Sequence, residues 1–350
     1  MGEPALHRRV MTGRDVWTLP LRGLLRVCSG CYAAAVAWRN RRFNRGTGAY
    51  TVGVPVISVG NITTGGTGKT PLVIEIVRRL QQRGRRVAAL SRGYKAAPGR
   101  AGDEIQMVAH RVPHAVCIAD PNRVAAAQRV IAEQHVDVIV LDDGFQHRHL
   151  ARDLDVVAID ATCPFGFGHL LPRGLLREPV ASLRRAGLIV ITRADQVEEN
   201  ELRALHARLD EIAPAVPRAN CRHRVTGLVQ PDGTPSSFAI GQDVGVLCFS
   251  AIGNPDAFET TVRQLGAALR GHIRWPDHHR YERADLIRVV SEAEHLAADV
   301  VLTTEKDAVK LANLDFDWPA PLLALRVDID FLDDGDTILS TALDQALQGR

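Results

Sequence analysis

The chain has 350 residues, of which 46% are apolar and 24% charged, and its formal net charge is +3. These values are ordinary for a soluble globular protein, and the length is comfortable for two domains. Four of the six cysteines are scattered singly, which argues against a disulfide framework. The charge is unevenly spread: residues 1–45 hold nine arginines and two acidic residues, a net +7, so the remainder carries −4. The basic segment points to a local anionic partner, whereas the main body gives no reason to expect nucleic acid.

The basic segment contains a predicted amphipathic helix that starts at Pro20. Apolar residues recur at helical spacing along one side: Leu21, Leu24, Leu25, Cys28, Cys31, Tyr32, Ala35 and Val36. The uncharged run 27–38 has only 12 residues, whereas a membrane span needs about 20. Because arginines follow at once, we expect this helix to lie in a membrane surface; the alternative is a first helix packed on the domain, with its arginines solvated. Cys28 and Cys31 are interpreted as small apolar residues of one helix face, not as a redox or zinc pair.

Residues 54–71, VPVISVGNITTGGTGKTP, combine a strand, a glycine-rich loop and the start of a helix. Val54–Val59 is an apolar, β-branched run typical of a buried strand, and a helix is predicted over Pro71–Gln82. This order is that of a phosphate-binding P-loop. Glycines let backbone N–H groups turn toward phosphate oxygens, and the helix N-terminus adds the positive end of its dipole. The candidate nucleotide-binding residues are Thr63, Thr64, Gly65, Gly66, Thr67, Gly68, Lys69 and Thr70.

Two residues of this loop have distinct predicted roles. Lys69 would bridge the β- and γ-phosphates of the nucleotide, and the Thr70 hydroxyl would ligate Mg²⁺. In the pattern G-x-x-x-x-G-K-[ST] the first glycine falls on Thr63, which is a departure, although G-T-G-K-T is intact. The strand before the loop and the helix after it favour the nucleotide interpretation over a plain glycine-rich turn.

Strand-like runs and helical patterns alternate beyond the glycine loop. The predicted strands are Val54–Val59, Arg86–Ser91, Ala115–Ala119, Val136–Leu141, Leu154–Ile159 and Leu188–Thr192, and further helices are predicted over Asn122–Gln134 and Asn200–Ile212. This alternation predicts an α/β fold of P-loop NTPase type, with a mostly parallel sheet covered by helices on both faces. In such sheets ligands bind beyond the carboxyl ends of the strands, so the residues that follow each strand are the candidates for chemistry.

A second, smaller α/β domain is predicted after a linker at about 213–224, which Pro214, Pro217 and CRHRV suggest. Its predicted elements are strand Val244–Phe249, helix Pro255–Leu269, a helix from Ala284, strands Val300–Thr303 and Leu322–Val327, and helix Thr337–Leu347. We therefore expect three parts: a basic membrane-associating segment over 1–45, a P-loop nucleotide-binding core over 46–215, and a smaller lid or substrate domain over 216–350.

Acidic pairs follow two of the predicted strands. Asp142 and Asp143 end the run 136–141, the place of a Walker B acid, where Asp142 would hold Mg²⁺ and Asp143 could orient a substrate hydroxyl. The alternative for this pair is a solvated turn or a helix cap. Asp103 and Glu104 form the second pair, which is placed in a loop; the residues alone leave open whether it is only solvated. Glu104 is a further candidate metal ligand.

The predicted second domain adds possible partners for these acids. His278 in DHHRY could close over the nucleotide site, and a histidine hydrogen-bonded to a carboxylate makes a general base near neutral pH. Spacing along the chain does not show whether Asp103 and His278 meet. Lys306 in TEKD is interpreted as a surface salt bridge in preference to a substrate contact. TRAD, residues 192–195, is a weak match to the base-reading N-K-x-D of GTP-binding proteins.

The chain resembles the tetraacyldisaccharide 4′-kinases of Gram-negative bacteria. The matching stretches run in order from about residue 54 to 312: VGNITTGGTGKTP, SRGY, AGDE, LDDGFQHRHLARDLDVV, PFGFGHLLPRGLLREP, AIGNPDAF, WPDHHRYERADL and TTEKDAVKL. Thr63 is ordinary in that family, whereas Lys95 and its neighbours after SRGY are less glycine-rich than expected.

The resemblance implies ATP-dependent phosphorylation of the 4′-hydroxyl of tetraacyldisaccharide 1-phosphate in lipid A biosynthesis, with ATP and Mg²⁺ as cofactors. It implies a peripheral enzyme on the cytoplasmic side of the bacterial inner membrane, whose partner is the lipid A disaccharide precursor. We expect a monomer. Carried over by position, Asp103 and His278 become the base pair that activates the sugar hydroxyl, and Lys69 acts on the phosphates.

The same resemblance implies roles for four other residues. Asp142 becomes the Mg²⁺-side acid and Asp143 a second catalytic carboxylate. Tyr94 becomes a substrate contact, and Arg177 a phosphate contact.

Two other classes of protein stay open at this point. One is a P-loop GTPase or switch protein, which TRAD suggests; strong GTP preference without a lipid requirement would favour it. The other is a membrane-associated partition-type ATPase that dimerises with nucleotide, and phosphate transfer to a saccharide would exclude that as the main role.

Overall fold

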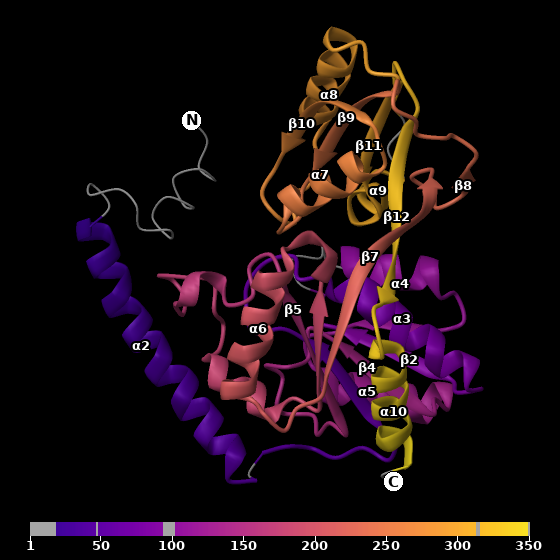
Figure 1. The fold of residues 1–350 in the computed structure, drawn as a ribbon. Helices are drawn as coiled ribbons and strands as arrows, with labels where there is room; N and C mark the ends of the chain where they lie inside the picture. Colours follow the sequence, from indigo (N-terminus) through magenta and orange to yellow (C-terminus); the bar gives the residue numbers. More distant parts are fainter. Residues whose placement is uncertain (1–18, 47, 94–101, 313–315, 349–350) are drawn as a thin grey trace.

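The computed structural model describes residues 19–46, 48–93, 102–312 and 316–348 (Figure 1). Tyr94 therefore lies outside the described residues. The helices are α2 (Leu19–Asn44), α3 (Lys69–Gln82), α4 (Asp103–Arg111), α5 (Arg123–Gln134), α6 (Glu199–Ile212), α7 (Pro255–Gln264), α8 (Arg283–His295), α9 (Glu305–Leu311) and α10 (Gly335–Gln348). Short 3₁₀ turns occur at η2 (Gly166–Gly168), η3 (Val180–Arg185) and η4 (Ala194–Gln196).

Twelve strands form one sheet through the described residues, in the order β10-β9-β11-β12-β7-β6-β5-β1-β4-β2-β3, with β8 paired to β7 off this path. The strands are β1 (Val56–Gly60), β2 (Val87–Ser91), β3 (Val116–Ala119), β4 (Val138–Asp142), β5 (Leu154–Asp160), β6 (Leu188–Thr192), β7 (Arg218–Val229), β8 (Pro235–Ser236), β9 (Gly245–Ser250), β10 (Ala268–Arg274), β11 (Val300–Thr304) and β12 (Leu322–Phe331). The mostly parallel α/β sheet predicted from the sequence is confirmed.

The sheet divides the molecule into two bodies joined by a ribbon (Figure 1). We call β1–β6 with α3–α6 and α10 the first body, and β8–β11 with α7–α9 the second body. All pairs within β1–β6 are parallel, and β7 continues them by pairing with β6 over Arg218–Asn220. Beyond that point β7 pairs antiparallel with β12 over most of its length. This two-stranded ribbon carries the chain between the bodies in both directions.

Helix α3 shows why the first body is stable. Its residues Leu72, Val73, Ile76, Val77 and Leu80 are spaced on one face, and all are buried against the sheet. The same core cluster contains Leu339 and Leu343 of α10. The helix that closes the described chain thus packs on the first body, although it follows the second body in sequence.

Three predicted boundaries differ from the structure. The predicted linker at 213–224 is largely strand β7, because the alternating polar residues of CRHRV belong to a ribbon strand that is buried only in part. The helix predicted over Pro255–Leu269 ends at Gln264. A turn with Gly266 at φ 80° follows it, and residues 268–274 form the edge strand β10. The last strand extends beyond Val327 to Phe331, where it pairs with β7.

Helix α2 lies along the outside of the first body (Figure 1). It is held by polar contacts to the segment 170–178: the Ser29 hydroxyl donates to the Leu170 carbonyl (2.9 Å) and the Tyr32 hydroxyl to the Arg177 carbonyl (3.0 Å). Its outer residues are largely exposed, including Leu21, Leu24, Val27 and Trp38. Within the described part of the chain, every helix falls short of the length and apolar character that crossing a membrane requires.

Candidate active site

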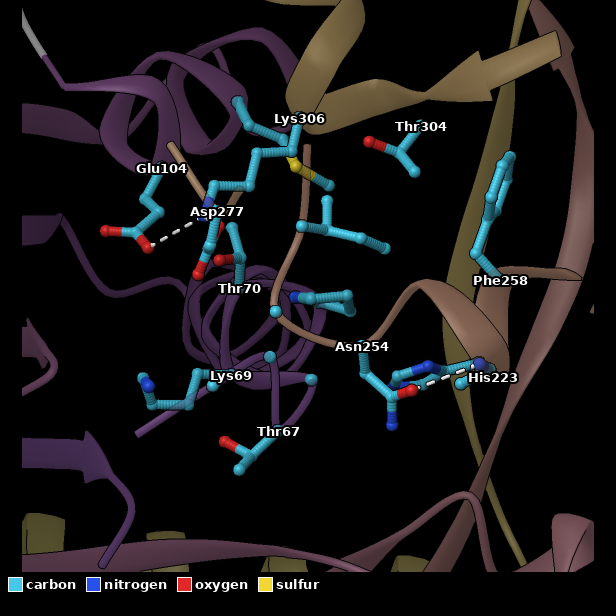
Figure 2. Close-up of a pocket in the computed structure, with 18 of the residues that line it drawn as sticks. Thr67, Lys69, Thr70, Glu104, His223, Asn254, Phe258, Asp277, Thr304 and Lys306 are labelled. Carbon is cyan, nitrogen blue, oxygen red and sulfur yellow. Dashed lines mark hydrogen bonds and ion pairs between the residues drawn. The ribbon is translucent and has the colours of Figure 1, made fainter. Parts of the chain in front are cut away.

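A cavity of about 550 Å³ lies between the P-loop and the second body. The whole of Thr63–Thr70 lines the cavity, together with Asp142 and His278. Lys306 and Glu104 lie beside each other, across the cavity from Thr67 and Lys69 (Figure 2). The residues predicted to follow the strands therefore meet at the carboxyl ends of the first-body strands, as a doubly covered parallel sheet requires.

The glycine loop has the backbone conformation that the sequence predicts. Gly65 and Gly68 adopt φ values of 117° and 77°, which L side chains rarely reach, and Gly68 caps α3 directly before Lys69. A Cβ on Gly68 would lie 2.6 Å from the buried ring of His223. The chain is thus closely packed behind the loop, which leaves the backbone amides and the N-terminus of α3 for a phosphate ligand.

The loop is braced by two residues of the TRAD motif. Thr192 donates its hydroxyl hydrogen to the Thr67 carbonyl (3.0 Å), and Arg193 donates to the Gly66 carbonyl (3.0 Å). Arg193 is also paired with Asp160 at 2.5 Å, and both side chains are nearly buried. Thr192 and Arg193 therefore stabilise the backbone of the phosphate loop. This role differs from the base recognition of an N-K-x-D motif.

The second body reaches the same loop through residues 251–254. A Cβ on Gly253 would lie 2.2 Å from the Gly66 nitrogen, so only glycine allows this approach. Asn254 donates to Asp160 Oδ2 (2.9 Å) and to Thr162 Oγ1 (3.2 Å). The sequence analysis assigned no role to the residues between the predicted strand Val244–Phe249 and the predicted helix Pro255–Leu269; the glycine and asparagine there were the available signal for this contact.

Asp142 is buried, with an exposed fraction of 1%, and its carboxylate oxygens are left without hydrogen bonds from the described residues. Burial, reinforced by the nearby Glu104, raises its pKa well above the ordinary range of a carboxyl. Asp142, Glu104 and Thr70 all line the cavity. Carboxylate and hydroxyl oxygens are the ligand types that a divalent cation takes, and Asp142 has no other partner among the described residues, so these residue types fit Mg²⁺.

Asp143 has the opposite electrostatic environment. It binds Arg177 through both oxygens (2.8 and 3.0 Å), and Lys69 lies 3.5 Å away. Burial alone would raise its pKa, but Lys69 and Arg177 outweigh burial and hold the pKa well below the usual range. Asp143 also adopts φ 52°, a left-handed conformation. Of these two adjacent carboxylates, Asp142 is without a partner among the described residues and Asp143 is paired. Both line the cavity that the P-loop lines.

Asp103 and His278 are brought together from different bodies. Asp103 Oδ2 lies 3.6 Å from His278 Nδ1, and Lys310 Nζ also lies 3.6 Å from Asp103. Burial opposes the charge on Asp103, but contacts with His278 and Lys310 lower its pKa. His278 adopts φ 63°, a conformation that costs energy in a residue with a side chain. The structure answers the question that spacing left open, since the carboxylate and the imidazole face each other.

Asp103 and Glu104 were placed in a loop by sequence reasoning, and this was wrong. They are the first two residues of α4, with Gly102 as the N-cap. The N-terminus of a helix favours carboxylates because its dipole and free N–H groups are positive there. The acidic pair followed by the apolar Ile105, Met107 and Val108 was the available signal for this helix start.

Lys306 was interpreted as a surface salt bridge; its ion pairs are present, but they lie at the cavity and not on the outer surface. Its ammonium group lies in the cleft, 3.2 Å from Asp277, 3.4 Å from Glu104 and 3.4 Å from His278 Nε2 (Figure 2). Burial opposes the charge, but the carboxylates of Glu104 and Asp277 raise the pKa of Lys306, which keeps it protonated. Lys306 therefore belongs to the second-body wall of the cavity.

A family model described as tetraacyldisaccharide-1-P 4′-kinase, LpxK, matches residues 21–348. The tetraacyldisaccharide 4′-kinase of Anaeromyxobacter sp. (strain Fw109-5) is 42% identical, over 97% of this chain and 94% of the relative. That of Syntrophus aciditrophicus (strain SB) is 35% identical, over 89% and 90% of the two chains. Among solved structures, LpxK from Aquifex aeolicus in complex with ATP is similar at a TM-score of 0.70 and 27% identity, over 93% of this chain and 99% of that one.

Proposed function

The chain belongs to the tetraacyldisaccharide-1-P 4′-kinase family, and we propose that its cavity is where the γ-phosphoryl group of ATP is transferred to the 4′-hydroxyl of the lipid A precursor. The protein is an ATP-dependent kinase of lipid A biosynthesis, and its acceptor is a tetraacylated disaccharide 1-phosphate. The observation that carries the placement is the Asp103–His278 pair, whose histidine lines the same cavity as the P-loop.

The proposed transfer uses residues of both bodies. His278, oriented by Asp103, accepts the proton of the 4′-hydroxyl as that oxygen attacks the γ-phosphorus in line. The new P–O bond forms while the bond from the γ-phosphorus to the β-bridging oxygen breaks, and ADP leaves. Lys69 stabilises the negative charge on the phosphate oxygens at the start of α3.

Asp143 and Arg177 are the proposed link to the acceptor side. The contact of both Asp143 oxygens with Arg177 Nη1 fixes the carboxylate next to Lys69, where it can orient the sugar hydroxyl. Three of the five N–H groups of Arg177 are on Nε and Nη2 and do not take part in the contact with Asp143. They can donate to an anionic oxygen of either substrate.

Mg²⁺ is the proposed metal, held by Thr70, Asp142 and Glu104. A bound divalent ion would neutralise phosphate charge that the chain's own cations leave uncompensated. The carboxylate of Asp142 is suited to this task because it has no other partner among the described residues.

We further propose that the enzyme works as a peripheral monomer on the cytoplasmic face of the inner membrane. A lipid with buried acyl chains stays in the bilayer, so the site must come to the membrane surface. The exposed Leu21, Leu24, Val27 and Trp38 of α2, with arginines beside them, suit an anionic lipid interface. In this proposal 1–45 is the membrane-associating segment, 46–215 the nucleotide core and 216–350 the lid domain, whose last helix α10 packs back on the core.

The P-loop GTPase alternative is not favoured, because Thr192 and Arg193 brace the phosphate loop. The decisive experiment incubates the protein with γ-labelled ATP and tetraacyldisaccharide 1-phosphate in detergent micelles. We expect a lipid labelled at the 4′-position, labelling at least about 100-fold slower with the His278→Ala variant, and little competition by GTP. Nucleotide hydrolysis at the same rate without lipid, and no labelled lipid, would contradict the proposal.

A further inference from the structure

A buried ion-pair cluster lies at the C-terminal end of α4, where one member, Glu305, borders the cavity. Arg111 Nη1 pairs with Glu305 Oε2 at 2.6 Å, and Arg111 Nη2 pairs with Asp328 of β12. The side chains of Arg111 and Glu305 are only 5% and 8% exposed. Glu305 Oε1 also accepts from Arg326 Nε at 2.9 Å, so both of its oxygens are used. Arg111 does not line the cavity.

This cluster joins the two bodies at the helices that carry the site. Glu305 is the first residue of α9, and the next residue, Lys306, contacts Glu104 at the opposite end of α4. Lys310, one turn further along α9, contacts Asp103. Helix α4 therefore packs against α9 with ion pairs at both of its ends.

The geometry makes α4 a rigid connection between the cluster and the base pair. Asp103 and Arg111 are the terminal residues of the same helix, so their Cα atoms are separated by about 12 Å at the rise of an α-helix. Asp103 has to lie opposite His278, which belongs to the second body. A contact that fixes the other end of α4 on the second body therefore limits how far Asp103 can slide or tilt from the imidazole.

We propose that Arg111 and Glu305 are positioning residues that hold Asp103 in register with His278. The proposal rests on the proposed function, in which this pair accepts the proton of the acceptor hydroxyl. Neither residue takes part in the proton transfer. The pair acts through α4, and breaking it lets the two bodies shift relative to each other, which separates the carboxylate from the imidazole.

Catalytic rates are sensitive to such shifts, since a misplacement of about 1 Å at the reacting groups can cost on the order of 100-fold in rate. We therefore expect Arg111→Met to lower kcat by about 10- to 100-fold. The Kd for ATP, measured with a fluorescent ATP analogue, should change by less than about twofold, because Arg111 does not line the cavity. Arg111→Lys should restore part of kcat, since one ammonium can pair with Glu305 or Asp328 but not in the bidentate manner of a guanidinium.

A double-mutant cycle with Asp103→Asn separates positioning from a general loss of structure. If Arg111 acts through Asp103, then Arg111→Met should change kcat by less than about twofold in the Asp103→Asn background, where there is no carboxylate left to position. If the two losses multiply, the proposal is wrong. An Asp103→Asn variant with the wild-type rate would instead overturn the base pair of the proposed function, and the present proposal with it.

Two further variants guard against misfolding. Glu305→Gln keeps the size of the side chain and should show the same loss of kcat and the same epistasis with Asp103→Asn, even if Arg111→Met fails to fold.

The matched control is Arg79→Gln on α3, whose side chain is nearly buried and pairs with Glu75 and with Asp336 of α10. It touches neither α4 nor α9 through these contacts, so we expect lower thermal stability with kcat within about twofold of the wild type. An equal loss of kcat in this control would assign the effect of Arg111 to stability.

Discussion

Two fully buried aspartates, one in each body, have opposite surroundings. Asp307 in α9 is 0% exposed, and it accepts hydrogen bonds from the Ala251 amide (3.0 Å), the Thr304 hydroxyl (2.8 Å) and Lys310 (2.9 Å). Asp142 at the end of β4 is equally buried, but its oxygens have no partner among the described residues. A buried carboxylate is tolerated when it is paired and is costly when it is not. The paired aspartate organises the second body, and the unpaired one is the residue to which the proposed function assigns a cation.

The largest expected effect comes from breaking the Asp103–His278 contact, which connects the two bodies. Asp103→Ala and His278→Ala should each lower kcat by roughly 10²–10⁴, the usual contribution of a positioned general base. ATP binding should persist, because neither residue belongs to the P-loop. Steady-state kinetics with the lipid acceptor and equilibrium binding of ATP measure the two quantities. Wild-type turnover in His278→Ala would show that the dyad is assigned incorrectly.

The next largest effect is expected at Asp307, the buried aspartate whose carboxylate is fully hydrogen-bonded. Asp307→Ala leaves Lys310 and the Ala251 amide without their shared acceptor, and removing one partner of a buried pair costs about 3–5 kcal/mol. The melting temperature should fall by several degrees in a thermal scan. The matched control is Asp344→Ala. Asp344 is an exposed residue of α10 that pairs with Arg83, so its loss should leave the melting temperature nearly unchanged. Equal melting temperatures for the two variants would contradict the structural role of Asp307.

A smaller effect is expected where the second body touches the P-loop. Gly253→Ala places a methyl group against the Gly66 backbone, so the loop 251–254 or the P-loop has to move. We expect the Kd for ATP to rise by about 3- to 10-fold, a cost near 1 kcal/mol. Gly241→Ala is the control, since a Cβ there meets nothing within 4 Å. Unchanged ATP affinity in Gly253→Ala would mean that the two loops are not packed together in solution.

The smallest expected effect concerns Asp142, the aspartate without a partner among the described residues. Replacing it should stabilise the fold, whereas replacing Asp307 should destabilise it. Since burial raises the pKa of Asp142, the folded state binds its proton more tightly than the unfolded state does, and stability is lost as pH rises from the ordinary carboxyl pKa of about 3.9. Asp142→Asn removes this cost. We expect its melting temperature, measured in EDTA, to exceed that of the wild type by a few degrees at pH 8 and by less at pH 5. A lower melting temperature at pH 8 would contradict this assignment, and Asp143→Asn, which loses its pairs with Arg177 and Lys69, should be destabilised instead.

The nucleotide side of the site could be predicted because its residues are contiguous. Strand β1, the glycine loop and α3 occupy one stretch, and hydrophobic periodicity together with glycine spacing determines such a unit locally. Asp142 and Asp143 were placed correctly for the same reason, since they directly follow an apolar strand. The family resemblance then indicated that His278 and Asp103 act together, although they are far apart in the chain.

The second body was harder to predict because its elements depend on distant partners. Strand β10 is a polar strand at the edge of the described sheet, where it pairs with β9. Strand β7 is stabilised by its pairing with β6 and β12 rather than by its own hydrophobic pattern. Lys306 could not be placed in the cleft from sequence, because its carboxylate partners Glu104 and Asp277 come from other segments. Long-range electrostatic contacts leave no periodic signature along the chain.

The position of α10 has a consequence for how the protein is made. Its residues Leu339 and Leu343 complete the core around α3, the helix that starts at Lys69. A ribosome synthesises the P-loop early, but the helix that finishes its hydrophobic core emerges only after the whole second body. The nucleotide-binding half therefore has to wait, incompletely packed, until the rest of the chain has been translated. Folding during synthesis should consequently favour the second body first, and a nascent chain stalled before residue 335 should bind ATP poorly although its entire P-loop has already been made.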